Sequence, residues 1–374
     1  MSKLKEHPVA AQAETQPYIP INKGHFDLEP PERTVAFSAK LAQGWEAQYQ
    51  EYRRQWIELP KSLEVRDYPL LVDLELASRC NLTCPMCPTV TEEFIEKRVK
   101  PFKKGLLDTN LALRIIDEIA GKVHALRLSW VGEPTLHGKL IDIARYAKGK
   151  GIKEVSFLTN GTKLHLAYFK KLAEAGVDWI TVSIDGMGEA YNRIRKPLKF
   201  DETLQKIRDI KKYKDEHGLT KPVIKIQGVW PAVRDNPELF YNTFAPITDL
   251  IAYNPLIDYL HKDKDIVYEE GFICPQHYQR LVISANGKAA MCSNDDNVDM
   301  VVGDANLQTI HEIWHGEKLN EIRRIHRQKD GFKTIPSCAR CYYPRKTVAN
   351  ESAKVNRRVI YIQNYINRKQ VVGE

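Results

Sequence analysis

The chain has 374 residues and a formal net charge of +8, and 43% of its residues are hydrophobic while 28% are charged. Such a length accommodates a catalytic domain with appendages, and the composition is that of a globular protein. No window approaches the roughly 18 apolar residues of a membrane span, and the polar N-terminal stretch contains no apolar secretory core. We therefore expect a cytoplasmic protein without a membrane partner.

The basic excess is spread along the chain, with some concentration after Arg345. It indicates either a solvated surface or an attraction for an anionic substrate. Neither zinc-finger spacing nor an aromatic–basic RNA-binding pattern is present, so no nucleic-acid partner is expected.

Residues 1–66 are expected to form a partly helical extension, with one helix over Ala36–Ile57 whose aromatic side chains pack on the main domain. From residue 67 to 265 apolar strands alternate with amphipathic helices, which predicts a parallel sheet of six βα-type units. Periodicity alone leaves an open sheet and a partial barrel undecided. The expected strands are Leu70–Ala77, Val123–Trp130, Glu154–Thr159, Trp179–Ile184, Val223–Val229 and Ile247–Asn254. The expected helices are Leu111–Ala120, Leu140–Gly149, Leu164–Ala175, Phe200–Glu216 and Pro237–Ala245.

Residues 266–345 are expected to form a small module, too small for a large core and therefore suited to a metal staple. Two strands, Arg280–Ser284 and Ala289–Cys292, meet through Asn286-Gly287, which predicts a type I′ hairpin. Helices are expected near Thr309–His315 and over Lys318–Gln328. The tail, 346–374, is polar, with a helix expected to include Val359, Ile360, Ile362 and Ile366.

The seven cysteines fall into two groups, which indicates metal ligation more than disulfides in a reducing compartment. Cys80, Cys84 and Cys87 directly follow the first expected strand. Three thiolates on one loop can bind three irons of a cubane and leave the fourth iron open, whereas ferredoxin-type clusters use four cysteines. A zinc site is the alternative, but it needs a nearby histidine, and none lies within 30 residues.

This Cys-x-x-x-Cys-x-x-Cys loop resembles that of the radical S-adenosylmethionine (SAM) superfamily. Further matches each follow a strand of their own: Gly132-Glu133-Pro134, the Thr159-Asn160-Gly161 turn, and Ser183-Ile184-Asp185-Gly186 with Arg195 downstream. The sequence departs from the family pattern at Val131, where a glycine is usual, and at Met86, where an aromatic residue is frequent. The resemblance implies a partial (β/α)6 TIM-like barrel that binds SAM.

The same resemblance implies roles for individual side chains. Glu133 accepts from the SAM ammonium group, Ser183 binds the ribose and Arg195 pairs with the carboxylate. Met86 packs against adenine, and Gln227 faces the adenosyl group. The expected cofactor-binding residues are thus Met86, Gly132, Glu133, Pro134, Asn160, Ser183, Asp185, Arg195 and Gln227.

The second cysteine group comprises Cys274, Cys292, Cys338 and Cys341. Four thiolates close a second [4Fe–4S] cluster completely, and the pattern resembles the auxiliary-cluster modules named SPASM and twitch. A structural zinc site with four cysteines is the alternative. The resemblance covers residues 68–345 and implies SAM and two [4Fe–4S] clusters as cofactors.

The resemblance implies a reaction in which SAM is cleaved to methionine and a 5′-deoxyadenosyl radical, which takes a hydrogen atom from substrate. Because the two clusters use every cysteine, no thiol remains as a hydrogen donor, and an auxiliary cluster can accept an electron instead. This favours a dehydrogenase of a sugar, aminocyclitol or other polyol. The alternatives are a peptide-modifying enzyme, an epimerase with a tyrosine donor, and, in a different class, an iron–sulfur electron carrier or zinc-binding protein that cleaves no SAM. Expected partners are a small molecule or peptide and a reductant such as flavodoxin or ferredoxin.

Substrate contacts are expected after the sixth strand, where Tyr253, Tyr259 and His261 are the candidate catalytic residues, with Asn254 and Asp258 beside them. His277 and Tyr278, next to Cys274, are further candidates. Ordinary loop and core residues are the alternative interpretation for all of them.

Overall fold

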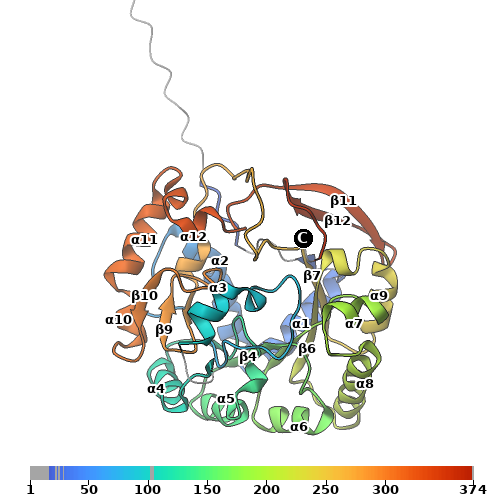
Figure 1. Ribbon diagram of the computed structural model, residues 1–374. Helices are drawn as coiled ribbons and strands as arrows, with labels where there is room; N and C mark the ends of the chain where they lie inside the picture. Colours follow the sequence, from blue (N-terminus) through green and yellow to red (C-terminus); the bar gives the residue numbers. More distant parts are fainter. Residues whose placement is uncertain (1–16, 22, 24–25, 28, 102–104, 373–374) are drawn as a thin grey trace, which may run out of the picture.

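A ten-stranded sheet in the order β1-β7-β6-β5-β4-β3-β2-β8-β9-β10 organises the chain in a computed structural model, which describes residues 17–21, 23, 26, 27, 29–101 and 105–372. Strands β2 to β7 are parallel neighbours, as the alternation of apolar strands and helices predicted. They curve around a central space (Figure 1). Their bounds are Leu71–Leu74 (β2), Ala125–Arg127 (β3), Glu154–Thr159 (β4), Trp179–Ser183 (β5), Val223–Val229 (β6) and Leu250–Asn254 (β7).

The outer face of the parallel strands is covered by helices (Figure 1). In the first of them, the Asp108 side chain accepts a hydrogen bond from the Leu111 amide and so caps the helix. Its buried residues recur at helical spacing from Leu111 to Ile119 and face the main apolar core. The helices are α4 (Thr109–Ile119), α5 (Leu140–Gly149), α6 (Leu166–Glu174), α7 (Gly188–Ile194), α8 (Phe200–Glu216) and α9 (Pro237–Phe244).

Two helices, α1 (Pro31–Ala42) and α2 (Glu46–Ser62), close the amino-terminal end of the parallel strands. Their aromatic side chains, among them Trp56, pack on Leu71 and Ala125, the first residues of β2 and β3. The single helix predicted over Ala36–Ile57 was wrong, because the chain turns at Gly44 with φ +85°. The packing of the aromatic side chains on the main domain is as expected.

The C-terminal part of the chain continues the same sheet, since β8 (Arg280–Ile283) pairs in parallel with β2. The predicted type I′ turn was wrong: Gly287 has φ +83°, but Asn286 does not adopt a positive φ. The Gly287 amide donates to Ser284 O at 2.8 Å, and the Ser284 amide donates to Lys288 O. These two hydrogen bonds close a three-residue loop between the strands. The remaining elements are β9 (Lys288–Ala290), β10 (Val301–Asp304), α10 (Ile310–Trp314), α11 (Glu317–Arg327) and α12 (Pro336–Ala339).

The tail forms a two-stranded sheet from β11 (Thr347–Val355) and β12 (Arg358–Tyr365), so the helix predicted there was wrong. Asn356 and Arg357, with φ of 50° and 60°, form the two-residue turn between the strands. Burial along β12 alternates with a period of two, which suits a strand. A further short strand, β1 (Phe26–Asp27), pairs antiparallel with β7. In the part of the chain that the structure describes, no helix has the length and apolar character of a membrane span.

Candidate functional site

The loop that carries Cys80, Cys84 and Cys87 follows β2 and lies against the Gly132-Glu133-Pro134 segment that follows β3. A Cβ on Gly132 would lie 2.1 Å from Ala77 O and 2.7 Å from Arg79 O. The Glu133 amide donates to Arg79 O at 2.9 Å. The close approach that Gly132 permits is therefore an approach to the cysteine loop itself.

Glu133 is buried, and its carboxylate is largely occupied by the chain. Oε1 accepts from the Thr135 amide and hydroxyl and from the Thr159 hydroxyl, at 2.5 to 3.1 Å. Oε2 accepts from the Asn160 amide at 2.7 Å. Glu133 thus ties the end of β3 to the end of β4, and Oε2 is the oxygen with room for a further donor such as an ammonium group. Pro134 is buried and starts a short 3₁₀ turn.

Asn160 lies beside the first cysteine of the loop. Its Nδ2 is 3.6 Å from Cys80 Sγ and 2.9 Å from Asn81 Oδ1. An amide donor near a thiolate stabilises the negative charge of an iron–sulfur ligand. Burial raises the pKa of the Cys84 thiol to about 11, so a thiolate there is favoured only when a cation accompanies it.

The other predicted SAM contacts lie at the end of β5 and after it, within β6, and in the cysteine loop. Arg195 forms an ion pair with Asp185, whose Oδ1 also accepts from the Val229 amide at 2.9 Å. The guanidinium predicted to bind a carboxylate is therefore already beside one that belongs to the chain. Ser183 is buried and stands opposite Gln227 in the register of β5 and β6, while Met86 is half-buried within the cysteine loop.

The second cysteine group lines one small buried cavity of about 10 Å³ together with apolar side chains such as Phe272 and Met291. His326 Nε2 lies 3.4 Å from Cys338 Sγ, and Asn294 Nδ2 lies 3.6 Å from Cys341 Sγ. His277 is buried here, with its ring 4.7 Å from that of His326, and Tyr278 is buried in the adjoining core.

The distances between the cysteine sulfurs help to distinguish a site for a single zinc ion from a site for an iron–sulfur cluster. Around one zinc ion, with Zn–S near 2.3 Å, any two sulfurs lie within about 4.6 Å of each other. Among the described residues, no three cysteine sulfurs lie within 4.8 Å of one another. Two groups of thiols, each with an amide donor directed at one sulfur, fit iron–sulfur clusters better than single zinc ions.

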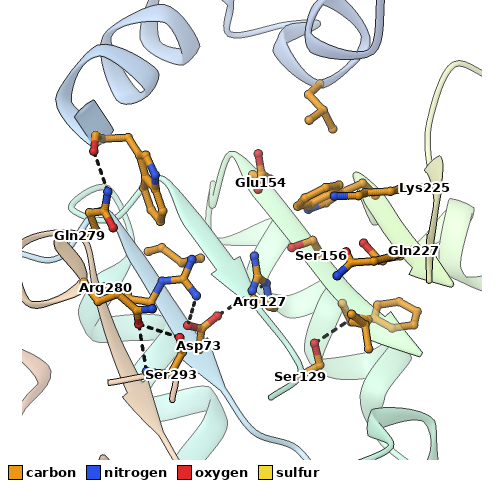
Figure 2. Close-up of a pocket in the computed structure, with 18 of the residues that line it drawn as sticks. Asp73, Arg127, Ser129, Glu154, Ser156, Lys225, Gln227, Gln279, Arg280 and Ser293 are labelled. Carbon is orange, nitrogen blue, oxygen red and sulfur yellow. Dashed lines mark hydrogen bonds and ion pairs between the residues drawn. The ribbon is translucent and has the colours of Figure 1, made fainter. Parts of the chain in front are cut away.

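A cavity of about 500 Å³ lies inside the curved sheet. Inward-pointing residues of neighbouring strands line it, among them Asp73, Arg127, Glu154 and Lys225 (Figure 2). Tyr342 and Tyr343, which directly follow Cys341, form part of its wall, as does Asn294.

The three candidate catalytic residues have different locations. Tyr259 lines the cavity, and burial together with the nearby charges of Asp296, Cys87 and Cys341 raises its pKa. Tyr253 was wrongly predicted to face substrate: it packs on the rings of Trp230 and Phe240, at 5.7 and 5.5 Å, because alternate residues of β7 face opposite sides.

The remaining loop candidates divide between the cavity and the protein framework. Asn254 lines the large cavity. His261 is exposed and borders a second cavity of about 40 Å³, which Tyr259 also lines. Asp258 is buried and accepts from the Lys262 and Asp263 amides, which is a structural role.

Several polar residues of the cavity were missed from the sequence. They are charged residues at alternate positions of otherwise apolar strands, such as Asp73 in β2 and Lys225 in β6, and that pattern was the available signal. Asp296, which borders the 40 Å³ cavity together with Tyr259, was also missed. Burial raises its pKa to about 8. No spacing motif marks Asp296 in the sequence.

The order of motifs along the strands agrees with comparison to known families. Residues 74–223 match the radical SAM superfamily, and residues 274–342 match the SPASM iron–sulfur cluster-binding domain. The chain belongs to the radical SAM superfamily. Its cofactors therefore include SAM and a [4Fe–4S] cluster, and the SPASM domain implies auxiliary iron–sulfur binding.

Relatives of this radical SAM enzyme differ in their named roles. The cofactor-modifying protein of tungsten-containing aldehyde ferredoxin oxidoreductase from Pyrococcus furiosus is 35% identical over 160 residues, which are 42% of each chain. The chain thus spans about two fifths of the length of the curated relatives it matches. SuiB of Streptococcus suis bound to SAM has a TM-score of 0.50 at 12% identity, covering 79% of this chain and 77% of SuiB. The anSMEcpe structure with AdoMet and a peptide also has a TM-score of 0.50, at 17% identity and 73% and 88% coverage. These likenesses show a radical SAM partial barrel followed by a small C-terminal module.

Proposed function

We propose that this radical SAM enzyme oxidises a hydroxyl-bearing carbon of a small sugar, aminocyclitol or other polyol to a carbonyl. The observation that carries the proposal is the position of the 500 Å³ cavity, which has Tyr259 in its wall near Cys87 of the first cysteine group and Cys341 of the second. A substrate in this cavity lies between the site of hydrogen removal and a second redox site.

The size and lining of the cavity favour a small polar substrate. Cavities of about 300–1,000 Å³ suit small molecules, and helices α1 and α2 close the amino-terminal end of this one. Charged and hydroxyl side chains supply hydrogen bonds to a polyhydroxylated molecule (Figure 2).

Each part of the oxidation has a residue set assigned to it. Cys80, Cys84 and Cys87 hold the cluster that binds SAM, and Cys274, Cys292, Cys338 and Cys341 hold the auxiliary cluster. When bound, these groups supply a radical that removes one hydrogen atom from carbon and an acceptor for one electron. The protein accepts the remaining proton, that of the substrate hydroxyl. Loss of one hydrogen atom, one electron and one proton accounts for the two electrons and two protons that the oxidation removes.

Tyr259 and Asp296 are placed to take that proton. Tyr259 lines both the large cavity and the 40 Å³ cavity that Asp296 borders. Since the pKa of Asp296 is raised to about 8, mainly by burial, its carboxylate is a stronger base than an exposed aspartate. A proton from the substrate hydroxyl passes to Asp296 by way of the Tyr259 hydroxyl.

The cysteine count favours oxidation over epimerisation. All seven cysteines belong to the two groups, so none is left to return a hydrogen atom to carbon. A substrate radical held beside a second redox site loses an electron instead.

The test is anaerobic turnover of the reconstituted protein with SAM and a panel of sugars and aminocyclitols, followed by mass spectrometry. We expect about eight irons per chain, from two four-iron clusters, formation of 5′-deoxyadenosine, and a product lighter by two hydrogens. Cys80→Ala should form no deoxyadenosine. In heavy water, a product of unchanged oxidation level that retains carbon-bound deuterium would show epimerisation and contradict the proposal. Bound zinc in place of iron, with no formation of 5′-deoxyadenosine, would contradict the proposal that the protein cleaves SAM.

A further inference from the structure

Arg127 is a partly buried cation with unused hydrogen-bonding capacity. It lies at the end of β3 and points into the large cavity (Figure 2). Among the described residues its ionic partner is Asp73, with 3.6 Å between Nε and Oδ1, which is longer than a hydrogen bond. The side chain remains 32% exposed, and that exposure is to the cavity. Its outer N–H groups are therefore available to a ligand.

Positive charge is in excess around Arg127. Arg280 shares Asp73 with it, at 3.1 Å from Nη1 to Oδ2, and its Nε is buried without a partner. Five basic residues line the cavity against two acidic ones: Lys23, Arg53, Arg127, Lys225 and Arg280 against Asp73 and Glu154. An excess of cationic over anionic side chains in a space shielded from water favours an anionic ligand.

Uncharged polar groups complete the lining. The Ser156 hydroxyl and the Trp179 indole N–H are buried without a hydrogen-bond partner among the described residues. Ser156 stands beside Arg127 in the register of β3 and β4, and beside Trp179 in that of β4 and β5. Buried polar groups in native proteins are nearly always satisfied, so a bound polar molecule accounts for these better than an empty space.

We propose that Arg127 and Arg280 form an anion subsite and that the substrate is an acidic carbohydrate, bearing a carboxylate or a phosphate ester. This inference rests on the proposed oxidation of a polyol in the same cavity. Arginine guanidinium groups bind both kinds of anion through paired hydrogen bonds.

The subsite also sets the direction in which the substrate enters. Ser156 precedes Asn160, which contacts Cys80, by four residues along β4 and the turn after it. With a rise of about 3.3 Å per residue, the anionic end is held roughly 13 Å along the strand direction from Asn160, which lies beside the cysteine loop. The acidic group therefore anchors the substrate, and a carbon at its other end lies toward the cluster.

Binding by calorimetry to the protein with its clusters intact, in the absence of SAM, tests the subsite apart from turnover. The probes are D-glucose, D-glucuronate and D-glucose 6-phosphate, and the difference between the two acids distinguishes a carboxylate from a phosphate. The wild type is compared with three variants. They are Arg127→Gln, the conservative Arg127→Lys, and the control Arg145→Gln, which removes an exposed arginine of α5. Iron content and circular dichroism establish that each variant is folded.

We expect at least one acid to bind about tenfold or more tightly than glucose, with most of that preference lost in Arg127→Gln, partly kept in Arg127→Lys and unchanged in Arg145→Gln. Equal affinity for charged and neutral probes, no binding of either acid, or an unaffected Arg127→Gln would overturn the subsite. Oxidation of a neutral polyol would then still support the proposed function. Binding of acids without any oxidised product would instead leave the subsite standing and defeat the proposed function.

Discussion

Gly132 lies so close to Ala77 that a Cβ on the glycine would be 2.1 Å from the alanine carbonyl oxygen. The Glu133 amide beside it donates to Arg79 O at 2.9 Å. The segment after β3 and the cysteine loop after β2 are therefore in direct backbone contact, and the glycine motif shapes the cysteine loop.

Replacement of Gly132 by alanine should displace the cysteine loop, because the contacting atoms belong to backbone that has no room to give way. We expect Gly132→Ala to lose about half of its iron and all formation of 5′-deoxyadenosine. Gly138→Ala is the matched control, since a Cβ there meets nothing within 4 Å. Normal iron content in Gly132→Ala would contradict this role.

The two amide–sulfur contacts allow each cluster to be tuned separately. Asn160 approaches Cys80 Sγ and Asn294 approaches Cys341 Sγ, both at 3.6 Å. Hydrogen bonds to cluster sulfurs raise the reduction potential, so Asn160→Ala should lower the potential of the SAM-binding cluster alone and Asn294→Ala that of the auxiliary cluster alone. Redox titration followed by electron paramagnetic resonance measures both. If either variant shifts both signals equally, the assignment of the two cysteine groups to separate clusters is wrong.

Glu154 should make stability depend on pH. Burial, with the charge of Asp178 second, raises its pKa from 4.5 to about 7. Between these values the unfolded chain releases the proton before the folded chain does, so the free energy of unfolding falls as pH rises, by about 3 kcal/mol in total. Urea unfolding at pH 5 and pH 8 should show this loss in the wild type and a smaller one in Glu154→Gln. Parallel pH profiles for the two proteins would refute the assignment.

Tyr259 should matter to product formation more than to SAM cleavage, because it lines the large cavity, whereas we propose that the cysteine loop holds the SAM-binding cluster. We expect Tyr259→Phe to reduce the ratio of oxidised product to 5′-deoxyadenosine by about tenfold. Tyr361→Phe, which changes an exposed tyrosine of β12, is the matched control and should leave the ratio unchanged. A ratio unaffected by Tyr259→Phe would remove Tyr259 from the reaction.

The sequence predicted most reliably where one local pattern determines one structure. The apolar runs Glu154–Thr159 and Val223–Val229 coincide with β4 and β6 in full, because their burial and their bounds are both set locally. The prediction for the tail was wrong because Val359, Ile360 and Ile362 fit the residue spacing of a helix as well as that of a strand. The turn at Asn356 and Arg357, which makes the segment a hairpin, contains no glycine that would mark it in the sequence.

Site residues were harder to predict where their contacts come from distant segments. Arg195 looked available for a ligand, but its pairing with Asp185 depends on how the loops after β5 fold back. The pairing of β8 with β2 brings Arg280 to Asp73 across more than 200 residues of chain, beside Arg127 of β3. Nothing in local sequence indicates that pairing.

The central claim, that the second cysteine group receives an electron from the substrate, is tested most directly by Cys338→Ala, which removes a buried sulfur of that group. The measurement is the amount of 5′-deoxyadenosine and of oxidised product in one reaction, with iron content determined on the same sample. We predict that iron falls by about half, that deoxyadenosine is still formed, and that the oxidised product is lost. Undiminished oxidised product in a variant that has lost the auxiliary cluster would contradict the account.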